Sequence, residues 1–123
     1  MNDFQVRTWM IYGPLADYND DDAREFYATW EDFLTQWDYK VINPIAPTFA
    51  RYEEDSKALI ARRDCTLMTS MCDGLILLPG WDEDSDATNR LYLAFMIGIP
   101  VIEATSFKPI AANLKVTGEI GTY

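Results

Sequence analysis

The residues with the clearest capacity for chemistry are the acids of one short stretch, Trp81-Asp82-Glu83-Asp84-Ser85-Asp86. The chain contains no histidine, so the commonest general base and the commonest metal ligand are both missing. Any catalysis would have to use carboxylates, tyrosine, serine, threonine or arginine. The plainer alternative for these acids is a solvated loop that caps the following helix.

The elements on either side predict where this loop lies. The apolar run Gly74–Leu78 is typical of a strand buried on both faces. Ala87–Ile97 suits a helix that is capped by Asp86 and ends at Gly98, and 100–103 resumes a β-branched run. Strand, loop, helix and strand form a βαβ unit, whose loop lies at the carboxyl end of a parallel strand. Open α/β sheets bind their ligands at this edge.

The rest of the chain adds two more strands and two more helices. In order, we predict a strand over 4–12 that ends at Gly13-Pro14, a helix over 23–40 with an aromatic face, a short strand at 41–42 and a helix over 51–71. Right-handed crossovers then give a three-layer α/β sandwich with a parallel sheet of order 2-1-3-4. Residues 115–123 could add a fifth strand. We expect one domain over 1–123, with a core at 4–103 and a C-terminal extension at 104–123.

Composition limits the partners and the compartment. The net charge is −10 and there is no basic run, which argues against direct binding of nucleic acid. The N-terminus lacks the pattern of a leader and no apolar run is long enough to cross a membrane, so we expect a cytoplasmic protein with no membrane partner. Cys65 and Cys72 lack metal-ligand spacing and are interpreted as reduced core thiols. We expect no metal and no cofactor.

Five short motifs, taken in order, suggest a family. They are Ile11-Tyr12-Gly13-Pro14, Ile42-Asn43-Pro44, Cys72-Asp73, Leu78-Pro79-Gly80-Trp81 and Gly98-Ile99-Pro100-Val101. Together, over roughly residues 8 to 103, they resemble the nucleoside 2-deoxyribosyltransferase-like superfamily, most closely its small phage-associated branch. The resemblance implies a flavodoxin-like (Rossmann-like) fold with a nucleoside or nucleotide bound over the carboxyl ends of the strands. It also implies a homo-oligomer, a dimer or higher, and the bacterial host cytosol if the protein is phage-encoded.

The resemblance also exposes a departure at the catalytic position. The family's nucleophilic glutamate lies eight residues before the glycine that ends the helix, and Arg90 is found there. A guanidinium cannot attack C1′ of a nucleoside. The family aspartate that orients the nucleophile lies eight residues before Asp73, whereas Asp64 lies nine before it, so Asp64 could take that role only if its helix is bulged.

Three functions follow from this departure. In the first, the protein binds or sequesters a nucleotide, and Arg90 holds a phosphate or carboxylate. In the second, it is an active N-glycosidase or deoxyribosyltransferase that uses Asp86 or Asp82 as nucleophile. In the third, it is a protein-interaction domain with a vestigial pocket. For Arg90 itself, the alternative is a surface residue that pairs with Asp86.

The predicted ligand-binding residues come from the loops after the first three strands and from the third helix. They are Tyr12, Gly13, Pro14, Tyr18, Pro44, Gly80, Trp81, Asp86 and Arg90. Tyr18 and Trp81 are offered as faces on which a base could stack, and the alternative for both is packing within a lid.

Overall fold

The computed structural model describes residues 7–14, 20–46 and 57–110. Its elements are β1 (Trp9–Tyr12), α1 (Asp20–Gln36), β2 (Val41–Ile42), α2 (Lys57–Met71), β3 (Gly74–Leu77), the short 3-10 helix η3 (Trp81–Glu83), α3 (Ser85–Ile97) and β4 (Val101–Glu103). The four strands form one sheet of order β2-β1-β3-β4 in which every neighbouring pair is parallel. The predicted α/β architecture and strand order are thus confirmed.

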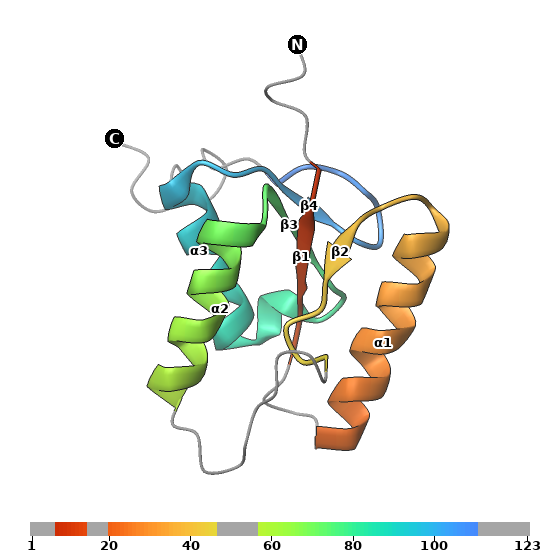
Figure 1. Ribbon diagram of the computed structural model, residues 1–123, viewed down its shortest axis with the longest axis horizontal. Helices are drawn as coiled ribbons and strands as arrows, with labels where there is room; N and C mark the ends of the chain where they lie inside the picture. The colour runs from red at the N-terminus through yellow and green to blue at the C-terminus, as the bar shows by residue number, and fades with distance from the viewer. Residues whose placement is uncertain (1–6, 15–19, 47–56, 111–123) are drawn as a thin grey trace.

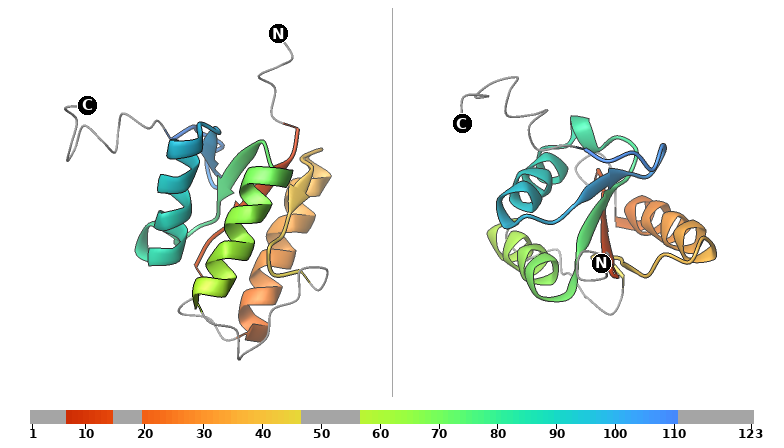
Figure 2. Two further views of the ribbon diagram at one scale, coloured as in Figure 1. Left: turned by 60° about the vertical axis from the view of Figure 1, so that its left-hand side comes forward. Right: turned by 90° about the horizontal axis from the view of Figure 1, so that it is seen from above.

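The helices cover the sheet in two unequal layers. Seen from above in Figure 2, α1 lies on one side of the sheet, and α2 and α3 lie together on the other. In Figure 1 each of the three helices has its N-terminal end pointing toward the lower side, which is the side where β1 ends. The structure is therefore a flavodoxin-like three-layer sandwich, and its carboxyl edge gathers the ends of the strands and the starts of the helices.

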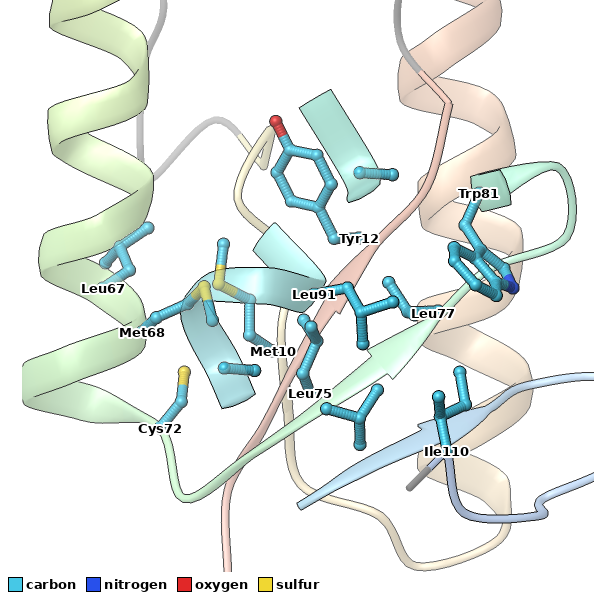
Figure 3. Packing of buried hydrophobic residues seen from close by; sticks show 13 residues of the cluster. Met10, Tyr12, Leu67, Met68, Cys72, Leu75, Leu77, Trp81, Leu91 and Ile110 are labelled. Atoms are coloured by element: carbon cyan, nitrogen blue, oxygen red, sulfur yellow. The ribbon is translucent and has the colours of Figure 1, made fainter. Parts of the chain in front are cut away.

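Alternation along the two central strands divides the core between these layers. Met10 and Tyr12 of β1 pack with residues of α2 and α3, in the cluster drawn in Figure 3. Ile11, together with Ile76 of β3, packs against α1 instead. Successive side chains of a strand point to opposite faces, so a strand buried on both sides must be apolar throughout. This explains the unbroken apolar run that predicted β3.

The boundaries differ from the predicted ones mainly at loops. Helix α1 spans Asp20–Gln36, whereas the sequence predicted 23–40. It ends earlier than predicted because the chain turns away at Asp38, which has a left-handed conformation with φ 67°. Strand β1 begins at Trp9, and the predicted residues 4–6 lie outside the described part, as do 51–56 of the second helix. The possible fifth strand over 115–123 also lies outside it.

Two glycines show how closely the loops of the carboxyl edge approach one another. A Cβ added to Gly13 would lie 2.7 Å from Cβ of Leu78, so the turn after β1 packs directly on the end of β3. Gly80 has φ +90°, and an added Cβ there would lie 3.1 Å from Cγ of Pro14. The loops after β1 and β3 are therefore in contact.

Within the part of the chain described, no helix combines the length and apolar character needed to cross a bilayer.

Candidate functional site

A buried polar cluster lies at the carboxyl edge, formed by Tyr12, Asp64 and Arg90. The Tyr12 hydroxyl donates a hydrogen bond of 3.0 Å to Oδ2 of Asp64, and Nη2 of Arg90 donates one of 2.9 Å to the same oxygen. The Arg90 guanidinium also lies over the Tyr12 ring, 4.9 Å from its centroid. Each of the three side chains therefore contacts the other two.

Each member of the Tyr12–Asp64–Arg90 cluster comes from a different element. Tyr12 is the last residue of β1, Asp64 lies in the middle of α2, and Arg90 lies in the second turn of α3. Lys57–Met71 is α-helical throughout, so Asp64 reaches residue 90 without the bulge that the family spacing had suggested. The bulge is therefore absent from α2, and a regular helix brings Asp64 within 2.9 Å of Arg90.

The ion pair in this cluster is buried, so each of its charges depends on the other for stabilisation. Asp64 is 1% exposed and Arg90 is 5% exposed. Burial lowers the pKa of the Arg90 guanidinium. Tyr12, the hydrogen bond to Asp64 and the charges of Asp64 and Cys65 raise that pKa by more, so the net change is upward. The alternative of a surface arginine paired with Asp86 is therefore wrong, since Arg90 is buried and its carboxylate partner is Asp64.

One hydrogen-bond donor of the cluster has no acceptor among the described residues. Nε of Arg90 is buried and has no hydrogen-bond partner within the described residues. A buried N–H without an acceptor costs about 1–3 kcal/mol. An oxygen that reached this nitrogen would recover that cost.

Hydrogen bonds from α1 hold the neighbouring loops. The Tyr27 hydroxyl donates to the carbonyl oxygen of Gly13 (2.8 Å) and accepts from the Gly13 N–H (2.7 Å), which fixes the turn after β1. After β2, Asn43 donates to Glu31 and accepts from the Ile45 N–H. The sequence placed Tyr27 only in an aromatic stripe, and nothing in its spacing indicated the role of its hydroxyl.

The start of α3 is capped by a different acid from the one predicted. Oδ1 of Asp84 accepts from the N–H groups of Asp86 (2.9 Å) and Ala87 (3.0 Å), and the helix begins at Ser85. Asp86 is thus a first-turn residue and not the cap. The reason is that η3 ends at Glu83, which leaves Asp84 in the extended conformation that a cap requires.

This arrangement gives a direct test. Asp84→Ala should lower the free energy of unfolding by about 0.5–2 kcal/mol, the usual cost of losing a side-chain cap. Asp86→Ala should cost less, because Asp86 contributes only a favourable charge near the helix start. Urea unfolding of both variants measures the difference. A larger loss in Asp86→Ala would show that the cap is assigned to the wrong residue.

Trp81 belongs to the core. It is 8% exposed, it packs in the same cluster as Leu77 and Ile110 in Figure 3, and its Nε1 donates a 3.1 Å hydrogen bond to Oε2 of Glu103. The open stacking face predicted for this ring is wrong, because the core covers it. Tyr18, the other predicted stacking residue, lies outside the described residues.

The other predicted site residues are unequally accessible. Gly13, Pro14 and Pro44 are buried, Gly80 and Asp82 are exposed, and Asp86 is partly exposed. Tyr12 and Arg90 are the predicted ligand-binding residues that join the cluster. The structure adds Asp64, which was weighed from the sequence only as an orienting residue.

Metal ligands and reactive thiols do not add to this site. Within the described residues, no three histidine, cysteine or acidic side chains converge as metal ligands would. Burial, with a smaller contribution from the charge of Asp73, raises the pKa of the Cys72 thiol to about 11. Such a thiol is protonated near neutral pH and is a poor nucleophile.

Comparison of the chain with protein-family models, with curated proteins and with solved structures found no match.

Proposed function

We propose that this protein binds a nucleoside or nucleotide at the carboxyl edge of its sheet and does not transfer the sugar. The observation that carries the proposal is the Tyr12–Asp64–Arg90 cluster: a buried guanidinium at the position where the family resemblance expects the nucleophilic carboxylate. Carboxyl edges of open parallel sheets are the usual ligand sites of this architecture. The cluster supplies polar groups there in a setting from which water is largely excluded.

Glycosyl transfer needs a carboxylate that can reach C1′ and attack it. Arg90 is cationic and has no usable lone pair. Asp64 cannot replace it, because the carboxylate is 1% exposed and one of its oxygens already accepts hydrogen bonds from both Tyr12 and Arg90. An oxygen engaged in this way is neither free nor accessible for attack.

The same cluster favours a ligand with an anionic or strongly accepting group. Asp64 balances the charge of Arg90, so the cluster does not add net positive charge. The Nε donor of Arg90 nevertheless lacks an acceptor among the described residues. Because this nitrogen is buried, a phosphate or carboxylate oxygen satisfies it only when the side chains around Arg90 move apart. Hydrogen bonds to charged groups contribute about 1.5–3 kcal/mol each, which would offset part of that rearrangement.

Thermal unfolding with a panel of nucleosides and their 5′-monophosphates tests the proposal. A ligand that binds only the folded state at one hundred times its dissociation constant adds about 2.7 kcal/mol to stability, so the Tm should rise for at least one member. Arg90→Met should weaken that binding by about 1.5–3 kcal/mol. The matched control is Arg24→Met, because Arg24 is an exposed arginine paired with the exposed Asp21 on α1.

Arg24→Met should bind as the unchanged protein does. A panel in which no compound shifts the Tm would reject nucleotide binding. If Arg90→Met binds as tightly as the unchanged protein, nucleotide binding stands but Arg90 is not part of the binding site.

A further inference from the structure

Among the described residues, α1 is the one helix on its side of the sheet, whereas α2 and α3 share the other side (Figure 2). Ala23, Tyr27 and Leu34 of α1 are buried and face the sheet. Glu31 lies on the flank of α1 toward β2, because it accepts a 3.1 Å hydrogen bond from Asn43, which follows that strand. The opposite flank therefore faces the β3–β4 side, where no second described helix packs beside α1.

This opposite flank carries a row of aromatic side chains. Phe33 lies about 200° around the helix from Glu31. It belongs to a series spaced by four, three and four residues, which follows one face of the helix and the turn after it, and which we call the aromatic row: Phe26, Trp30, Phe33 and Trp37. The ring centroids of Trp30 and Phe33 are 5.4 Å apart, and those of Phe33 and Trp37 are 6.2 Å apart. Phe33 is 40% exposed and Trp37 is 64% exposed, so this end of the row is open to solvent.

Acidic side chains border the aromatic row. Glu25 and Asp32 each directly precede a residue of the row, Asp22 lies one turn before its first residue, and all three are exposed. Asp38, also exposed, follows the last residue of the row. The last turn of α1 contains no basic residue, since the only one in the helix is Arg24, so the negative end of the helix dipole is not offset there. The row therefore combines an apolar surface with surrounding negative charge.

From this combination we infer that the aromatic row is a docking site for a partner protein, and that the docking segment is a basic amphipathic helix. Tryptophan and phenylalanine bury large apolar areas, and tryptophan is a typical anchor of protein interfaces. Arginine or lysine beside the partner's apolar stripe would meet the bordering acids, and a guanidinium also stacks on an indole ring. A second copy of this chain is a poor occupant, because two aromatic rows in contact would bring their acids together in chains that each carry a net charge of −10.

The aromatic row is separate from the candidate nucleotide site. Tyr12, Asp64 and Arg90 meet on the side of the sheet that α2 and α3 cover, whereas the row belongs to α1 (Figure 2). Docking on the row therefore goes beyond nucleotide binding and does not depend on it. Arg90→Met should leave docking unchanged.

Fluorescence anisotropy of a labelled synthetic peptide with the full chain tests the inference. The peptide spans four helical turns, with leucine along one face and arginine on both sides of that face. A second peptide has the same composition in an order that does not align the leucines, and it should bind at least about 10-fold more weakly. Trp37→Ala should weaken binding of the first peptide at least about 30-fold, as expected for an anchor residue. Tyr92→Ala is the matched control and should bind unchanged, because Tyr92 is a 52% exposed aromatic residue on α3.

Charge gives an independent reading. Asp32→Asn should weaken binding and make it less sensitive to salt, whereas Asp82→Asn, at an exposed acid of η3, should not. Far-UV circular dichroism checks that each variant is folded. Equal binding of the two peptides, no binding of the first, or equal effects of Trp37→Ala and Tyr92→Ala would overturn the inference. So would a dimer of the chain alone that Trp37→Ala dissociates, because the row would then join two copies.

Discussion

Asp64→Asn should lower the free energy of unfolding by about 3–5 kcal/mol, because it leaves the Arg90 charge buried without its counterion. Asparagine has nearly the shape of aspartate and can still accept from the Tyr12 hydroxyl, so the change removes mainly the charge. The matched control is Asp21→Asn, which breaks a 3.4 Å pair with Arg24 at the surface. That loss should be at most about 1 kcal/mol. Denaturant unfolding measures both.

A second substitution separates charge from packing. Asp64→Asn combined with Arg90→Met removes both charges, so the double variant should be more stable than Asp64→Asn alone. The free energies of the four proteins in this cycle give the coupling between the two residues directly. If Asp64→Asn costs no more than the surface control, the ion pair does not contribute as a buried one and the description of the cluster is wrong.

The second large effect is on chemistry at position 90. The unchanged protein should release no detectable free base from 2′-deoxynucleosides, and Arg90→Glu is the substitution with a chance of restoring release. A guanidinium beside C1′ has no lone pair with which to attack, and because Asp64 balances its charge it gives the oxocarbenium-like transition state no stabilisation. A carboxylate at this position supplies a nucleophile and a negative charge that favours that transition state.

The cluster limits how much activity can return. Arg90→Glu puts a second carboxylate next to Asp64, and two adjacent buried carboxylates share a proton near neutral pH. Arg90→Gln is the control, because glutamine has the size of glutamate but cannot form a glycosyl ester by this route. Release of base by Arg90→Gln, or clear release by the unchanged protein, would contradict the role given to Arg90. The second outcome would move the nucleophile to Asp86.

The sequence was sufficient for the fold because strong local signals agreed with each other. The apolar run of β3, the breaks at Gly13-Pro14 and Gly98, and the rule of right-handed crossovers together fix a parallel sheet of order 2-1-3-4. The end of α1 was less predictable. It depends on Asp38 adopting a left-handed conformation, for which aspartate has only a modest preference.

The site was predictable in position but not in its contacts. Spacing placed Arg90 toward the carboxyl edge, yet its pairing with Asp64 depends on how closely α2 packs on α3, which no local pattern records. The cap was ambiguous for a related reason, since Asp84 and Asp86 have the same chemistry and the end of η3 decides between them. Trp81 was placed in the right loop, but its burial depends on the core that it joins.

Ligand-observed proton NMR of a 2′-deoxynucleoside 5′-monophosphate with the unchanged protein tests binding without transfer most directly, because one sample reports both. Saturation transferred from the protein to the base and sugar protons measures binding, and the anomeric H1′ signal measures whether the glycosidic bond is intact. We predict saturation transfer for at least one of the four common nucleotides, with the H1′ signal unchanged after prolonged incubation. Signals of free base, or no saturation transfer to any of the four, would contradict it.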